Sequence, residues 1–187
     1  MPKYYLDKKR QTFIIEDYNK APVFSNFLPA ISGVWGIPLW AFYVNRAQGM
    51  VSFGIKDKDH AILEFLPANK AYQAVSFLGF RTFLKIEGKF YEPFKINSEY
   101  LRKERFLIRS FDLSIEEINS SLELRFFVNY FTLPNMNFPA FVRILTIENL
   151  SSEREIEIVD GLPQVLPFHT RDLFLKHLSR TLEAWMK

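Results

Sequence analysis

Cysteine is absent from the 187-residue chain, and its absence excludes several kinds of chemistry. Without cysteine there is no disulfide framework, no thiolate nucleophile and no cysteine-ligated zinc or iron–sulfur centre. Glycine is scarce, with 7 residues that form neither a phosphate-binding loop nor the Gly-x-Ser-x-Gly turn of serine hydrolases. The sequence contains no apolar run near the roughly 18 residues of a membrane-spanning helix, and no signal peptide. It therefore predicts a cytoplasmic protein without a membrane segment.

Aromatic residues are abundant instead. They make up 17% of the chain, and 20 of them are phenylalanine. Such residues favour strands and large buried interfaces, so the composition already indicates a β-rich fold. The formal net charge of +3 is too small to indicate a nucleic-acid-binding protein unless the charge is clustered.

Alternation of apolar and polar residues with a period of two dominates the middle of the chain, as expected for strands. Residues 122–130 place five apolar side chains on one face: Leu122, Leu124, Phe126, Val128 and Tyr130. Similar segments are 111–116, 142–146, with Val142, Ile144 and Thr146 on one face, and 155–158. Segments 39–44 and 50–55 flank a five-residue loop closed by Gly49, which predicts a hairpin. The sequence predicts a wide antiparallel β-sandwich.

The end of the chain follows a helical pattern instead. Thr170 is the expected N-cap, and a helix is expected from about residue 171. Its apolar stripe contains Leu175, Leu178, Leu182 and Trp185. No glycine or proline ends this pattern before Lys187, so we expect the natural protein to continue beyond this helix.

Acidic residues and histidines offer no self-contained active site. Glu116 and Glu117 are neighbours in a predicted strand, so they point to opposite faces and cannot act on one glycosidic bond. We interpret them as part of a solvated strand face, and Asp57 and Asp59 as turn-forming residues. The histidines lack the spacing of metal ligands on a helix and are interpreted as capping or surface residues: His60, His169 and His177. We predict no catalytic residue and no metal site.

Basic and aromatic residues interleave over residues 80–85 and 89–91. A platform for single-stranded nucleic acid has this pattern, because bases stack on rings while cations follow the backbone. A strand with one solvated face has it too, and acidic neighbours balance the positive charge: Glu87, Glu92, Glu99 and Glu104. Exposed aromatics also suit a sugar, which has an apolar face and a ring of hydroxyls. Nucleic acid is not expected as a partner.

Several longer segments point to a known family. The segments are NFLPAISGVWGIPLWAFYVNRAQG (26–49), SFG (52–54), AILEFLPANKAYQ (61–73), YFTLP (130–134), residues 143–149 and VDGLPQ (159–164). Together they resemble the N-terminal domain of cellobiose phosphorylase-like inverting glycoside phosphorylases, especially the 1,2-β-oligoglucan phosphorylase branch. The likeness runs through nearly the whole chain.

This resemblance implies a galactose-mutarotase-like antiparallel β-supersandwich over residues 1–170. Residues 171–187 would begin a linking helix toward an (α/α)₆ barrel outside this sequence, which carries the general acid. The chain alone is then inactive. The complete enzyme would cleave β-glucosides or β-glucans as a homodimer, with inorganic phosphate as co-substrate and no other cofactor.

The resemblance also assigns a role to one loop of this domain. In the family, such loops help to form the wall of the substrate site, which would make Asn45, Arg46 and Gln48 substrate-binding residues. Ala47 stands where the family pattern has glycine, and this difference is expected to affect the turn geometry.

Two other functions fit the same fold class. One is a free-standing carbohydrate-binding β-sandwich. The other is a mutarotase-type enzyme, which would need a histidine and a glutamate as an acid–base pair in the sheet. The only nearby pair, His60 and Glu64, is separated by the strand register and fits this role poorly.

Overall fold

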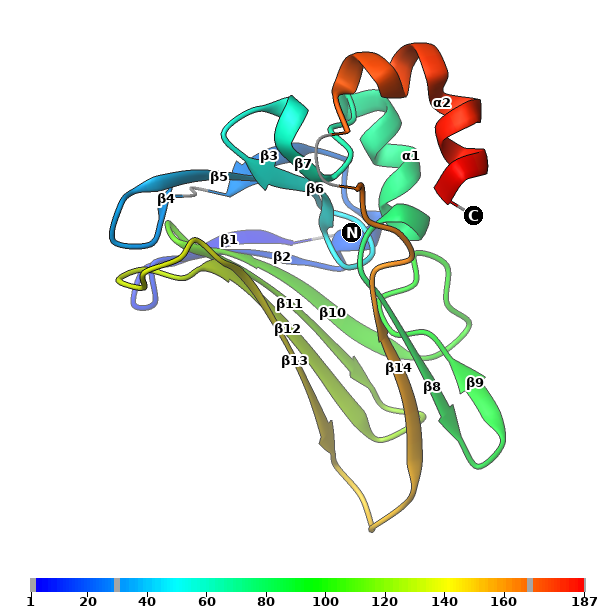
Figure 1. Ribbon diagram of the computed structural model, residues 1–187. Coiled ribbons are helices and arrows are strands. Elements are labelled where there is room, and N and C mark those ends of the chain that lie inside the picture. The colour runs from blue at the N-terminus through cyan, green and yellow to red at the C-terminus, as the bar shows by residue number, and fades with distance from the viewer. Residues whose placement is uncertain (1–2, 29–30, 168–169, 187) are drawn as a thin grey trace.

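Three antiparallel sheets and two helices make up the chain in a computed structural model, which describes residues 3–28, 31–167 and 170–186. Figure 1 shows the six-stranded sheet as one layer, with the five-stranded sheet above it and the three-stranded sheet beside its lower part. The protein is therefore mainly β and sandwich-like with a C-terminal helix, as its sequence predicts. None of the helices in the described part is long and apolar enough to cross a membrane.

The six-stranded sheet takes strands from both halves of the chain, in the order β1-β2-β10-β11-β12-β13. Their bounds are Tyr4–Asp7, Thr12–Glu16, Arg102–Ile108, Asp112–Asn119, Leu124–Thr132 and Phe141–Asn149. The predicted alternation is confirmed in β12, where every second side chain is fully buried: Leu124, Phe126, Val128 and Tyr130.

The predicted hairpin is confirmed in the five-stranded sheet, as β5 (Ile37–Val44) and β6 (Met50–Ile55). The other strands of this sheet are β3, β4 and β7, over Ser25–Leu28, Ile31–Ser32 and Ala61–Leu63. The three-stranded sheet has the order β14-β8-β9, over Ile156–Gly161, Arg81–Ile86 and Lys89–Tyr91. Two short 3₁₀ helices are η1 (Tyr18–Lys20) and η2 (Lys58–His60).

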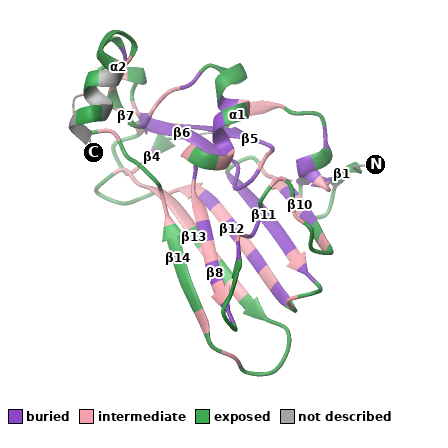
Figure 2. Cartoon of the chain, turned by 90° about the vertical axis from the view of Figure 1, so that its right-hand side faces the viewer, coloured by how far each residue is buried: buried purple, intermediate pink, exposed green. Residues whose placement is uncertain are grey.

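One hydrophobic core joins the three sheets. Ile15 and Phe106 of the six-stranded sheet, Tyr43 of the five-stranded sheet and Leu84 of the three-stranded sheet all belong to it. In Figure 2, buried residues lie along the middle strands of the sheets, while β14 at the edge is largely exposed. Aromatic side chains therefore pack between the sheets and form much of this core.

Helix α1 (Ala68–Leu78) is not among the elements that the sequence analysis identified. It begins after Pro67 without a capping side chain, so the usual start signal is missing. Its buried residues are small, namely Ala71, Ala74 and Val75, and they pack in a second cluster with residues of β5 and β6. The helix thus covers the outer face of the five-stranded sheet.

Helix α2 (Asp172–Met186) confirms the expected C-terminal helix but not its expected N-cap. The Thr170 hydroxyl donates to the Pro167 carbonyl oxygen at 2.7 Å instead of accepting a hydrogen bond from the helix. The Asp172 backbone N–H donates to the Asp59 carboxylate at 2.9 Å, so η2 supplies the acceptor. The helix bends at Leu178, which is exposed, and the side chains of Leu182 and Trp185 lie outside the described residues.

One interpretation of a strand face is wrong. Glu116 and Glu117 are both buried, because each is paired with arginine and covered by neighbouring structure. In β13, Val142, Ile144 and Thr146 share one face, as predicted, and this face points away from the core. The opposite face packs against the core: Phe141, Leu145 and Ile147. Arg143 lies on the same inward face. Because arginine is polar, the sequence does not indicate that this side chain is buried.

Candidate functional site

A hollow of about 450 Å³, here called the aromatic hollow, lies beside β9 and the loop 92–101 that follows it. Phe83, Phe90, Tyr91 and Tyr100 contribute its rings. Phe90 is 78% exposed and Tyr100 is 37% exposed, so both present aromatic surface to solvent. The Tyr100 ring meets that of Tyr91 edge to face, with centroids 5.1 Å apart, which supports Tyr100 from below.

Polar groups border the same hollow: Glu92, Lys95, Asn97, Ser98 and Glu99. Glu92 is held in place by Arg81, whose Nε donates to the carboxylate at 2.8 Å. The Ser98 hydroxyl oxygen accepts from the Tyr100 backbone N–H at 3.3 Å. The hollow therefore combines accessible rings with hydrogen-bonding groups, a combination that suits an amphipathic ligand such as a sugar.

A second hollow of about 300 Å³ adjoins the first and shares Glu92, Lys95 and Asn97 with it. On its other side lie Ala47 and Gln48 of the hairpin loop 45–49. Loop 92–101 is therefore a common wall of two hollows, and one of them reaches the loop that the family resemblance singles out.

Asn45 and Arg46 hold the hairpin loop against residues 18–24. The Asn45 amide accepts from the Phe24 backbone N–H at 2.8 Å and donates to the Pro22 carbonyl oxygen at 3.0 Å. Arg46 donates to the Tyr18 carbonyl oxygen at 3.0 Å and to that of Ala21 at 2.5 Å. Both side chains thus make intramolecular contacts, and their substrate-binding role remains a prediction.

Gln48 is buried at the border of the second hollow, where it connects the sheets. Its amide donates to the Thr82 hydroxyl at 2.9 Å and accepts from Arg143 at 2.7 Å. Arg143 in turn binds both oxygens of Asp160, at 2.6 and 2.8 Å. Its guanidinium lies 4.8 Å from the centre of the Phe80 ring. Of the three predicted residues, Gln48 borders the second hollow.

Ala47 occupies a left-handed backbone conformation, with φ of 46°. An alanine pays roughly 1–2 kcal/mol for this conformation, whereas glycine adopts it freely. Glycine loses more entropy on folding, by about 0.4–1 kcal/mol. We therefore expect Ala47→Gly to stabilise the fold by about 0.5–1 kcal/mol, measured by urea denaturation. A destabilised variant would show that the buried alanine methyl group outweighs the backbone strain.

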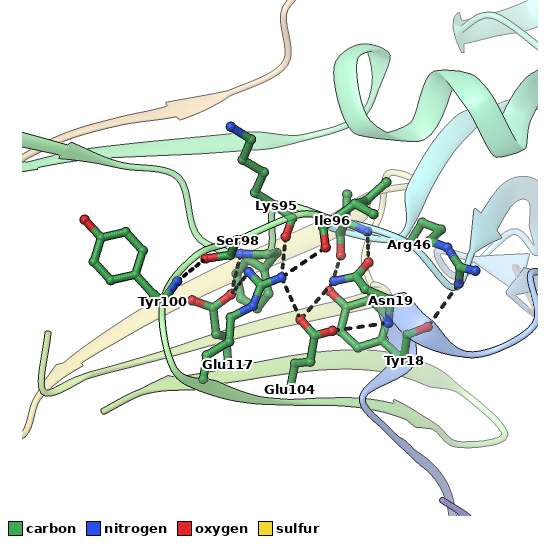
Figure 3. A network of polar contacts seen from close by, with 12 residues as sticks. Tyr18, Asn19, Arg46, Lys95, Ile96, Ser98, Tyr100, Glu104 and Glu117 are labelled. Carbon is green, nitrogen blue, oxygen red and sulfur yellow. Dashed lines mark hydrogen bonds and ion pairs between the residues drawn. The ribbon is translucent and has the colours of Figure 1, made fainter. Parts of the chain in front are cut away.

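A buried ion cluster contains Arg102, Glu104 and Glu117. Figure 3 shows Glu104 and Glu117 beneath Lys95 and Ile96 of loop 92–101. Arg102 contacts the Glu104 carboxylate at 3.2 Å and the Glu117 carboxylate at 2.9 Å. Only 8% of the Arg102 side chain is exposed, and Glu117 is fully buried. β10 and β11 place Glu104 and Glu117 directly opposite each other, which is why both carboxylates reach one guanidinium.

The cluster also binds the surrounding loops. The Glu117 carboxylate accepts from the Phe94 backbone N–H at 2.6 Å and from the Tyr91 hydroxyl. Arg102 donates to the Lys95 carbonyl oxygen of loop 92–101. On the other side, the Asn19 amide donates to Glu104 at 2.9 Å. Asn19 also accepts from the Ala47 backbone N–H at 2.9 Å, so the contacts extend to the hairpin loop.

Burial raises the pKa of both Glu104 and Glu117, although Arg102 acts in the opposite direction. Two carboxylates that share one guanidinium away from water favour taking up a proton. A raised carboxyl pKa is also found in acid–base catalysts. Here, however, Glu117 is covered by the loop and fully occupied by partners within the chain, so the arrangement fits a structural role.

Other predicted residues have local roles. Asp57 caps η2 by accepting from the Asp59 backbone N–H at 2.9 Å, which confirms the turn-forming interpretation. His60 lies 2.8 Å from the Asp57 carboxylate, and His169 lies outside the described residues. In the described ranges, no three acidic or histidine side chains gather in a way that could hold a metal ion. The basic residues Arg81 and Lys85 pair with Glu92 and Glu157, as expected for a balanced strand face.

Comparison of the sequence with models of known protein families and with curated proteins finds no match. The function is therefore inferred from the geometry of the hollows and from the segments that resemble a known family. Loop 92–101, which forms the wall of both hollows, was not among the predicted site residues. The only signal in the sequence was the interleaving of aromatic and basic residues just before it.

Proposed function

We propose that this chain is a non-catalytic carbohydrate-binding domain of a glycoside phosphorylase, and that it binds a β-linked glucan or oligosaccharide at the aromatic hollow. The observation that carries the proposal is the exposure of Phe90 and Tyr100 beside hydrogen-bonding side chains. The mainly β, sandwich-like fold agrees with the domain that the sequence resembles.

A pyranose has an apolar face and a ring of hydroxyls, and the hollow offers contacts to both. The apolar face of the sugar packs on Phe90 or Tyr100, which buries aromatic surface that is otherwise exposed. The hydroxyls then exchange hydrogen bonds with Glu92, Asn97 and Ser98 at the border. Because the Glu92 carboxylate is already held by Arg81, it is preorganised as an acceptor.

Catalysis is assigned to another part of the enzyme. Inverting cleavage of a glycosidic bond needs a general acid beside the bond and space for the attacking group on the opposite face. Glu104 and Glu117 have raised pKa values but lie in the buried ion cluster. We expect the isolated chain to release neither glucose nor a sugar phosphate from β-glucans. Release of either product would contradict the non-catalytic assignment.

Replacing either exposed ring of the hollow should weaken sugar binding. Burial of a large side chain contributes roughly 1.5–3 kcal/mol, so we expect Phe90→Ala and Tyr100→Ala each to lower the affinity for a β-linked glucotriose about tenfold or more. Isothermal titration calorimetry measures this change. Phe111→Ala is the matched control, because Phe111 is exposed in the β10–β11 turn and does not border the hollow. Equal effects of all three substitutions would contradict the site.

Assignment to a phosphorylase has its own test. We propose that the complete protein adds a helical catalytic barrel and forms a homodimer. The coding sequence downstream of Lys187 should then encode several hundred further residues with helical periodicity. A stop codon at that point would instead favour the alternative, a free-standing carbohydrate-binding sandwich. Sedimentation analysis of the complete protein tests the dimer.

A further inference from the structure

Phe94, in the wall shared by the hollows, has an unusual backbone conformation. Its φ is 64°, in the left-handed region that bulky residues rarely adopt. The side chain is fully buried and packs against Phe126, with ring centroids 6.3 Å apart. A conformation of this kind is strained and persists only where surrounding contacts impose it.

The contacts that impose this conformation come from the buried ion cluster. The Phe94 backbone N–H donates to Glu117 at 2.6 Å. The carbonyl oxygen of the following residue, Lys95, accepts from Arg102. A further contact joins Arg102 to the Ile96 carbonyl oxygen at 3.5 Å. Three successive residues of loop 92–101 are therefore attached to two charged side chains of the six-stranded sheet.

Those three residues lead directly into the groups that would meet a ligand. Lys95 and Asn97 border both hollows, and Ser98 and Tyr100 follow in the aromatic hollow. Displacement of the loop at Phe94 would move all of these groups together. We propose that Glu117 and Arg102 are positioning residues of the carbohydrate site, which hold loop 92–101 in its binding conformation without touching the ligand.

The identity of the ligand rests on the proposed function. The role of Glu117 and Arg102 in holding loop 92–101 does not depend on it. Glu117 is a stronger acceptor as a carboxylate than as a neutral acid, because charge-assisted hydrogen bonds are roughly twice as strong. Replacing the Glu117 carboxylate by a neutral amide should therefore weaken its contact with the Phe94 backbone N–H and loosen the loop. The ionisable or polar groups around Glu117 come from four elements: Tyr18 of η1, Tyr91 of β9, Arg102 and Glu104 of β10, and Asn119 of β11.

The experiment compares Glu117→Gln with Glu116→Gln. The two residues are neighbours in β11 and both are buried, but Glu116 pairs with Arg105 and Arg125 on the opposite face. Hydrogen exchange followed by mass spectrometry should show the amides of loop 92–101 exchanging about tenfold faster or more in Glu117→Gln. The amides of β11 and β12, and the whole of Glu116→Gln, should exchange as in the unmodified chain.

Sugar binding supplies the second readout. At one fixed pH, the affinity for a β-linked glucotriose should be about tenfold lower or more in Glu117→Gln than in the unmodified chain, because the loop would no longer be held in its binding conformation. Glu116→Gln should follow the unmodified chain. Equal affinities of the unmodified chain and Glu117→Gln would overturn the positioning role in binding.

A second variant covers the case in which Glu117→Gln does not fold. Arg102→Lys keeps one positive charge but loses the forked contact to both the carboxylates and the loop, and it should accelerate exchange in the same loop. Unchanged loop exchange in the folded variants would overturn the proposal, as would equal acceleration of loop and core. If the unmodified chain binds no glucotriose, the proposed function fails, and the exchange data alone decide whether the cluster positions the loop.

Discussion

Arg102→Ala is expected to destabilise the fold by about 3–5 kcal/mol, the usual cost of removing one partner from a buried ion pair. The substitution leaves Glu104 and Glu117 without their shared guanidinium, in a place where water does not replace it. It also removes the donor to the Lys95 carbonyl oxygen. Urea denaturation followed by circular dichroism measures the free energy of unfolding.

The same substitution should have a characteristic pH dependence. Burial already raises the pKa of Glu104 and Glu117, and the loss of Arg102 raises both further in the folded state. A carboxyl whose pKa is raised by folding contributes stability at low pH and loses that contribution as the pH rises through its folded value. The destabilisation should therefore be larger at about pH 8 than at about pH 5.

Arg105→Ala is the matched control for this prediction. Arg105 lies in the same strand, but its side chain is 39% exposed and its partner Glu116 also has Arg125 at 2.8 Å. We expect its removal to cost less than about 1 kcal/mol. Similar losses for Arg102→Ala and Arg105→Ala would mean that burial of the cluster does not determine its contribution.

Phe126→Ala is expected to cost about 3–5 kcal/mol, as for other fully buried phenylalanines. Phe126 is fully buried, and its ring lies 5.8 Å from that of Tyr91 and 6.3 Å from that of Phe94. The cavity would lie between β12 and the elements that form the aromatic hollow. Differential scanning calorimetry should therefore show a large decrease in the melting temperature.

Phe127→Ala provides the comparison, because the next residue in the strand points to the other face. Phe127 is only partly buried, and the Arg125 guanidinium lies 5.9 Å from its ring centre. Its loss should cost about 1 kcal/mol. If the two phenylalanines proved equally important, the inward-facing assignment of Phe126 would be incorrect.

The phenylalanine pair also shows what could be predicted from sequence. In β12 the alternation identifies both the strand and its buried face, because each position contrasts with its neighbours. The hairpin of β5 and β6 was predictable because Gly49 marks its loop. α1 was missed because small buried residues and an uncapped start leave no strong pattern.

The ion cluster could not be predicted in this way. Glu116 and Glu117 are charged and lie in a strand, which normally indicates a solvated face. Their burial depends on arginines that reach them across neighbouring strands, and thus on a register that distant parts of the sequence do not reveal. That loop 92–101 lines the two hollows was not predicted for a related reason, because contacts with that cluster hold the loop in place.

The path of the chain through the six-stranded sheet has a consequence for biosynthesis. β10 to β13 form a meander of sequence neighbours, whereas β2 must pair with β10 across a connection that contains the whole five-stranded sheet, α1, β8 and β9. Closing so long a loop is entropically costly, and contacts of high sequence separation slow folding. On the ribosome, the N-terminal hairpin must wait with Ile14 and Ile15 uncovered until β10 has emerged. A chaperone that protects nascent apolar segments would act during that interval.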